Sequence, residues 1–94
     1  MFRYFLNSTI VVVDYNLSPG ASCQSGYLKI TNIEECHQAG KSLLPSRLVL
    51  PLSLGTTRPR GCFHSKADDY IYFNVDMGEN SKPGDSVICK NGKY

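Results

Sequence analysis

Short apolar runs separated by turn residues recur along the chain, and this pattern predicts a small sheet. The run from Thr9 to Tyr15 is rich in β-branched and apolar residues, and the turn residues from Asn16 to Gly20 follow it. Tyr27 to Ile30 predicts a second short strand, because its alternate residues would face opposite sides of a sheet.

The second half of the chain predicts a hairpin and one more strand. Cys62 to Ser65 and Tyr70 to Val75 form the two arms, and residues 66–69 form the turn between them. On the second arm Ile71 and Phe73 would share one face. Val87 to Lys90 predicts the last strand. The segment from Ser46 to Thr57 is apolar but irregular, since proline and glycine interrupt it. We therefore expect a packed loop there, with a short strand near Leu48 to Leu50.

One helix is predicted between the second strand and this loop. Thr31 with Glu34 forms a capping box, and Asn32 with Glu35 offers the same arrangement one residue later. Pro45 disfavours helical backbone at the residue before it, so the helix should end there. A narrow apolar stripe recurs at helical spacing, and its small members imply a close approach to the sheet. The stripe consists of Ile33, Cys36, Ala39, Gly40 and Leu43.

These elements predict an α+β fold with one helix packed on an antiparallel sheet of about four strands. The 94 residues are enough for one domain with a thin core. We divide the chain into an extension containing a strand, residues 1–22, and a disulfide-stapled module, residues 23–94.

The four cysteines are far apart in sequence, with no Cys-x-x-Cys pair. An even set of dispersed cysteines in a short chain indicates two disulfides and a secreted or extracellular protein, with an organelle lumen as the alternative. Four cysteines permit three connectivities. We favour Cys36 with Cys62, because these residues face each other across the helix and sheet layers. Cys23 and Cys89 would then join the two ends of the module.

Other chemistry based on these residues is less favoured. A zinc site could use Cys36, His37, Cys62 and His64, but adjacent helical side chains diverge too far to bind one ion easily. A Cys–His nucleophile would require a free thiol. Glu34 and Glu35 are explained as first-turn acids that offset the helix dipole. The hairpin acids Asp68 and Asp69 lack the alternating oxygen donors of a calcium loop. We therefore expect no catalytic residue, metal or cofactor.

Composition excludes some classes and leaves the N-terminal segment open. Charged residues make up 19% of the chain and the net charge is +2, so a nucleic-acid binder is not indicated. No apolar run approaches the length of a membrane span. The first residues resemble a signal peptide, but polar residues interrupt its apolar region, and we interpret residues 8–15 as a strand. Asn7 and Asn16 each begin a glycosylation acceptor triplet.

Basic and aromatic side chains flank the predicted hairpin and form the candidate binding residues. Guanidinium and aromatic groups together can bind sugars, sulfated glycans or an acidic protein surface. The alternative is an ordinary turn whose cations keep it soluble. The candidates are Arg58, Arg60, Lys66, Tyr70 and Tyr72.

Four ordered blocks resemble a known but uncharacterised module. They are Ile30 to Cys36, Arg58 to Phe63, Ile71 to Asn74 and Ser86 to Lys90, with Cys23 ahead of them. This pattern is similar to an orphan four-cysteine module that recurs, often in tandem, in secreted and membrane-anchored proteins of dinoflagellates, haptophytes and other marine protists. The resemblance implies an extracellular disulfide domain, loosely similar to PAN/apple domains, and no catalytic residue is carried over.

The resulting hypothesis is a non-enzymatic extracellular interaction module that binds a glycan or a protein. A second hypothesis is a structural subunit of a larger cell-surface or photosynthetic assembly, because the apolar stretches 9–13 and 48–54 exceed what one small core can hide. A third, a small enzyme or secreted effector, rests only on the His and Asp residues around the hairpin, such as His64.

Overall fold

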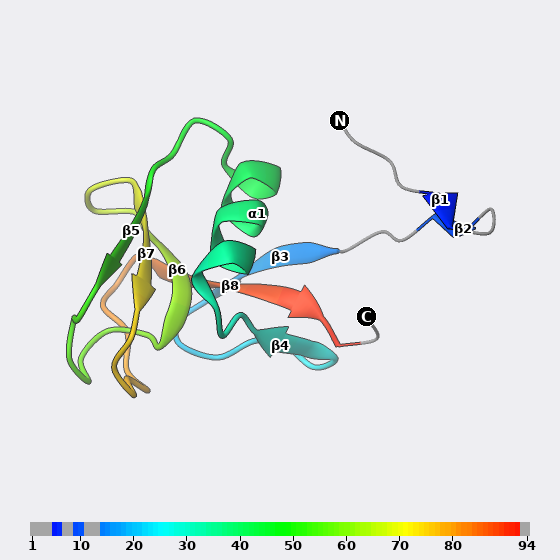
Figure 1. Ribbon diagram of the computed structural model, residues 1–94. Helices are drawn as coiled ribbons and strands as arrows, with labels where there is room; N and C mark the ends of the chain where they lie inside the picture. The colour runs from blue at the N-terminus through cyan, green and yellow to red at the C-terminus, as the bar shows by residue number, and fades with distance from the viewer. Residues whose placement is uncertain (1–4, 7–8, 11–13, 93–94) are drawn as a thin grey trace.

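The sheet is built around β8 (Asp85–Asn91) in the computed structural model, which describes residues 5–6, 9–10 and 14–92. β3 (Tyr15–Pro19) pairs antiparallel with one edge of β8. The other edge is shared by two strands, β4 (Tyr27–Lys29) and β6 (Gly61–Ser65), both antiparallel to β8. Three strands that precede β8 in the sequence therefore pair with this one strand (Figure 1).

β4 and β6 follow one another along the same edge of β8. β4 pairs with residues 89–91, whereas β6 pairs with residues 85–87. Ile88 lies between the two paired stretches. At this junction β4 ends and the chain continues toward the helix described below. β6 begins at the same place, after the loop that precedes it. The fork between the two strands positions the candidate site described below.

β6 and β7 (Tyr70–Asn74) form the expected hairpin around residues 66–69. β5 (Val49–Leu52) pairs with the far side of β7 and runs parallel to it. The order is β3-β8-β6-β7-β5, with β4 also paired to β8. The main sheet of the described residues thus has six strands and is mixed. The prediction of about four antiparallel strands gave too few strands, and it missed the parallel pair of β5 and β7.

Pro51 explains why the sequence showed β5 only in part. The carbonyls of Leu48 and Leu52 accept hydrogen bonds from the N–H groups of Ile71 and Val75. Since strand residues alternate, Pro51 directs its missing N–H away from β7, where no ladder bond is lost. Proline is tolerated on such an edge strand, although it made the segment look like a loop.

The predicted strand from Thr9 to Tyr15 is displaced in the structure. β1 (Phe5–Leu6) pairs with β2 (Thr9–Ile10), and residues 11–13 of the predicted strand lie outside the described residues. The strand that joins the main sheet is β3, which consists largely of the residues expected to form a turn. Pairing with β8 outweighs the low strand propensity of this segment, because each residue of β3 gains a partner there.

The helix α1 (Ile33–Leu43) begins and ends as expected. Its N-cap is Asn32, whose Oδ1 accepts a hydrogen bond of 2.8 Å from the Glu35 N–H, so the second capping alternative is correct. Leu44 closes the C-terminus, where its N–H bonds to the Gly40 carbonyl at 2.7 Å. No helix among the described residues is long and apolar enough to cross a membrane.

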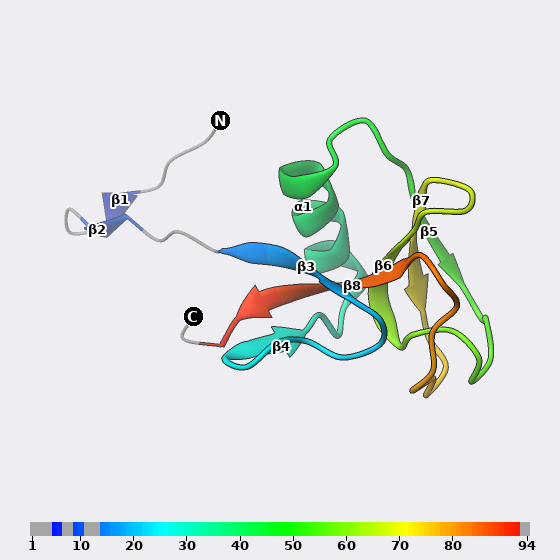
Figure 2. The same ribbon diagram turned by 180° about the vertical axis from the view of Figure 1, so that it is seen from behind.

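α1 packs tightly on one face of the sheet through its small residues (Figures 1 and 2). A Cβ placed on Gly40 would lie 3.0 Å from Ile71 Cδ1 and 3.2 Å from Val49 Cγ2, which is too close for an unshifted side chain. The predicted close approach is therefore confirmed. The disulfide between Cys36 and Cys62 joins the helix to β6 within this layer. The buried residues on this face are Ile30, Cys36, Ala39, Cys62, Ile71 and Ile88.

The opposite face of the sheet carries a second, smaller cluster. Phe63, Tyr72, Val87 and Cys89 are buried there. The disulfide from Cys89 to Cys23 holds the segment between β3 and β4 against this face. Both disulfides have the connectivity favoured from the sequence, and each covers a different face of one sheet.

Candidate functional site

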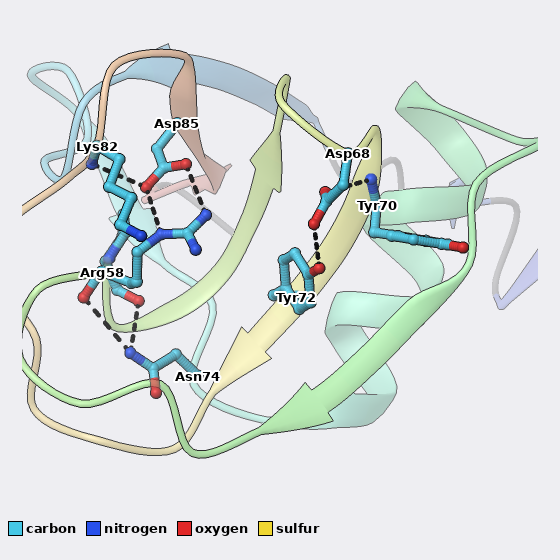
Figure 3. A network of polar contacts seen from close by, with 8 residues as sticks. Arg58, Asp68, Tyr70, Tyr72, Asn74, Lys82 and Asp85 are labelled. Atoms are coloured by element: carbon cyan, nitrogen blue, oxygen red, sulfur yellow. Dashed lines mark hydrogen bonds and ion pairs between the residues drawn. The ribbon is translucent and has the colours of Figure 1, made fainter.

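The structure separates the five candidate binding residues into different places. Arg58, Tyr70 and Tyr72 gather on the sheet face opposite α1 (Figure 3). Arg60 and Lys66 lie just before and just after β6, so they are at opposite ends of that strand. A single binding surface that includes all five residues does not form.

Arg58 is engaged within the protein. Its Nε and Nη2 donate to the two carboxylate oxygens of Asp85, each at 2.9 Å, and its guanidinium lies over the rings of Phe63 and Tyr72 with centroid distances of 5.0 and 5.8 Å. The hydrogen bonds to Asp85 raise the pKa of Arg58. Because the Arg58 and Asp85 side chains are only 14% and 2% exposed, this pair is part of the internal packing.

The side chain of Tyr72 is also bound within the protein. Its hydroxyl donates to Asp68, which also accepts a hydrogen bond of 3.1 Å from the Tyr70 N–H (Figure 3). The hydrogen bond to Asp68, together with burial, raises the pKa of Tyr72 to about 12. Burial acts to raise the pKa of Asp68, but the hydrogen bonds from Tyr72 and from the Tyr70 N–H outweigh it and the net shift is downward. These contacts fix the hairpin turn.

Asn74 closes the turn after β7. Its Oδ1 accepts from the N–H groups of Asp76 and Leu54 at 3.1 and 3.0 Å. Its Nδ2 donates to the carbonyls of Gly55 and Pro59, both at 3.1 Å. The side chain is 1% exposed, so the loop from β5 to β6 is held from within the protein. Through its bond to the Asp76 N–H, Asn74 closes the turn with its own side chain.

A pocket of about 240 Å³ lies at the fork between β4 and β6. Gly61 begins β6 with φ of 80°, and a Cβ on it would lie 2.6 Å from the Ile30 carbonyl oxygen. Only glycine allows the two strands to meet this closely. The pocket is lined by Lys29, Ile30, Thr31, Arg60, Gly61, Phe73, Asn74 and Val75.

Two cations line this pocket without a partner anion in contact. No ion pair or hydrogen bond joins the side chain of Lys29 or Arg60 to another group within residues 14–92. Burial lowers the pKa of Lys29, the positive charge of Arg60 lowers it further, and the carboxylate of Glu79 opposes the shift. The pocket therefore carries excess positive charge.

Sequence reasoning found Arg60 and missed the other members of the pocket. Lys29 and Phe73 were assigned to strands, and nothing in the sequence indicated that the ends of these strands meet. The close approach of Gly61 to the Ile30 carbonyl joins segments that are far apart in the sequence, so no local pattern indicated it.

Lys66 and Asn16, two other candidates from the sequence, do not line the pocket. Lys66 is exposed in the hairpin turn. Asn16 lies in β3 with its Oδ1 buried and without a hydrogen-bond partner, whereas Asn7 lies outside the described residues. Glycosylation at either asparagine stays a prediction.

The histidines have separate roles. His37 is exposed on α1. His64 Nε2 lies 2.8 Å from Asp69 Oδ1, and Asp69 also pairs with Arg47 Nε at 2.6 Å. The hydrogen bonds from Arg47 and then from His64 lower the pKa of Asp69. All four cysteines are in disulfides, and no group of potential metal ligands occurs in the part of the chain that the structure describes.

Together these features define a small α+β domain with two disulfides and a cationic pocket at a fork in its sheet. Compared with known proteins, the chain matches no family model, no curated protein and no solved structure.

Proposed function

We propose that this protein is a non-enzymatic extracellular binding module and that the pocket at the β4–β6 fork is its ligand site. The observation that carries the proposal is the pair of cations, Lys29 and Arg60, that line one pocket without an ion-pair partner in contact among the described residues. Perturbed charges in a cleft are typical of sites that act on a ligand.

Two further observations support this assignment. Disulfides persist in oxidising compartments, and each of the two in this domain covers a face of the sheet. The resemblance to an extracellular four-cysteine module agrees with the same location. Arg58 and Tyr72 are used for packing, whereas Arg60 is the predicted binding residue that lines the pocket.

A matched pair of charge reversals tests the proposal. The folded, oxidised protein is screened on a glycan array and on immobilised extracellular proteins, and its hits are re-measured with Arg60→Glu and Lys66→Glu. Both variants change the net charge equally, but only Arg60 lines the pocket. Binding lost in R60E and kept in K66E supports the proposal. Equal loss in both variants, or no hit on either surface, would overturn it.

A structural subunit of a larger assembly is the second candidate function. Four apolar side chains around the outer strands are largely exposed, namely Leu48 at 64%, Leu52 at 44%, Val75 at 62% and Met77 at 67%. Such residues can mark a surface that another chain covers. Size-exclusion chromatography with light scattering separates the two functions, since obligate association favours the assembly and a stable monomer favours the binding module.

A further inference from the structure

The pocket at the β4–β6 fork also indicates what kind of ligand it takes, and this inference rests on the proposed function. Pockets that hold drug-sized ligands have volumes of roughly 300–1,000 Å³. At about 240 Å³ the pocket is smaller, so it suits one compact group or a single ring. A long ligand would extend outside it.

The lining combines charge with an apolar wall. Lys29 supplies a compact ammonium and Arg60 a planar guanidinium, and both groups donate several hydrogen bonds to oxyanions. Phe73, which is half-buried, supplies apolar surface, and the Thr31 hydroxyl adds a neutral polar group. This set matches an oxyanion attached to a ring that carries hydroxyl groups.

The charge arrangement is unfavourable for the protein alone. Lys29 is half-buried beside Arg60, and burial and that neighbouring charge both disfavour its charged form. The carboxylate of Glu79 acts on Lys29 but does not form an ion pair with it. A neutral residue in β4 would avoid this cost. An anionic ligand would remove it, because the ligand would supply the missing negative charge.

We infer that the pocket binds one sulfate or carboxylate group carried on a sugar ring, with Lys29 and Arg60 on the oxyanion and Phe73 against the ring. The two cations converge on one pocket and do not follow a groove, so they match a single compact anion better than the spaced carboxylates of an acidic peptide. Sulfate esters and uronic acids share this chemistry, and the experiment below separates them.

Calorimetric titration of the oxidised protein in low-salt buffer without phosphate tests the inference. The probes are glucose 6-sulfate, glucuronate, glucose and tetra-aspartate. We expect at least one charged sugar to bind about tenfold or more tightly than glucose, since a charge-assisted hydrogen bond changes affinity by at least that factor. Stronger binding of glucose 6-sulfate identifies the sulfate ester as the group, and stronger binding of glucuronate identifies the carboxylate.

Three variants connect binding to the pocket. Lys29→Met and Arg60→Met should each weaken binding of the charged sugar about tenfold or more, whereas Lys66→Met should change it less than about twofold. Thermal unfolding of each variant shows that it is folded. Binding that survives in K29M and R60M would overturn both this inference and the proposed site.

The remaining outcomes separate the inference from the proposed function. Equal affinity for glucose and both charged sugars would overturn the inference, because the ring alone would then be recognised. Tetra-aspartate binding that requires Lys29 and Arg60, without sugar binding, would also overturn it, but the fork would remain a binding site. Failure of all four probes would overturn the sugar assignment, and the array hits of the wild-type protein would then decide the proposed function.

Discussion

Arg58 and Asp85 form two parallel hydrogen bonds of 2.9 Å, which join the loop before β6 to the first residue of β8. Asp85 also accepts a hydrogen bond of 3.0 Å from the Lys82 N–H (Figure 3). The Asp85 side chain is buried and the Arg58 side chain is mostly shielded from water. The pair therefore differs from a surface salt bridge, which contributes little to stability.

We predict that Arg58→Met lowers the free energy of unfolding by about 3 kcal/mol, because the buried carboxyl group of Asp85 would lose its charged hydrogen-bond partner. Urea unfolding at neutral pH measures this change. Arg60→Met is the control and should change stability by less than about 0.5 kcal/mol, since Arg60 is exposed and forms no ion pair in the described part of the chain. Similar losses in both variants would contradict the prediction.

Gly61→Ala should destabilise the protein by more than about 2 kcal/mol, because the new Cβ would add a clash with the Ile30 carbonyl to the strain of a positive φ. Gly26→Ala is the matched control. Gly26 has a similar φ of 84° but no atom within 4 Å of the new Cβ, so only the strain of about 1 kcal/mol should appear. The difference between the two variants isolates the close approach at the fork. Equal effects would mean that the strands can separate without loss.

Lys29→Met should leave the free protein as stable as the wild type or more stable. Folding lowers the pKa of Lys29, so the charged form of this group opposes folding below that pKa, and its penalty fades as the pH rises through it. Removal of the charge should therefore raise the unfolding midpoint at pH 7, and the gain should shrink toward pH 10 as the wild-type lysine loses its proton. Differential scanning fluorimetry across this range checks the sign. A variant less stable than the wild type at pH 7 would show that Lys29 contributes to the fold itself.

Tyr72 should be the last to ionise of the tyrosines that the structure describes, with a pKa of about 12. Because folding raises this pKa, Tyr72 contributes stability that is complete below pH 10 and is lost as the pH rises through 12. Absorbance at about 295 nm follows phenolate formation, and circular dichroism on the same samples reports whether the fold persists. Tyr72→Phe should remove the latest transition, and Asp68→Asn should move it to lower pH. A late transition that both variants leave unchanged would assign it to another tyrosine.

The two disulfides should contribute nearly equally to stability. Sequence separations of 66 and 26 residues correspond to chain-entropy contributions of about 4.3 and about 3.5 kcal/mol. The shorter link has two fully buried cysteines, whereas Cys23 of the longer link is half-buried, and loss of each buried sulfur adds roughly 1 kcal/mol. Both alanine pairs, C23A/C89A and C36A/C62A, should therefore cost about 5 kcal/mol, which is comparable to the whole stability of a small domain. Thermal denaturation measures each loss, and a cost under about 2 kcal/mol for either pair would contradict this account.

The sequence predicted the elements that local signals specify. Asn32 and Pro45 mark the ends of the helix, the spacing of Ala39 and Gly40 indicates its packed face, and the alternation in β7 separates the residues of the two sheet faces. The position of Cys36 on the buried face of the helix favoured Cys62 as its partner.

The features that were missed depend on contacts between distant segments. β3 forms from turn residues because β8 offers them partners, and β5 is a strand because its proline lies on the outer edge. The pocket exists because β4 and β6 meet along one edge of β8 and bring Lys29 near Arg60. The residue pattern of β4 does not indicate that β6 pairs with the same edge of β8.

The central place of β8 has a consequence for how the protein is made. β8 comes after every other strand in the order of synthesis, yet β3, β4 and β6 all need it as a partner. A nascent chain can form the β6–β7 hairpin and oxidise Cys36 with Cys62 early, but the earlier strands must wait with their backbone groups exposed. Cys23 also waits for Cys89, so a premature bond from Cys23 to another thiol would have to be exchanged before the native disulfide forms.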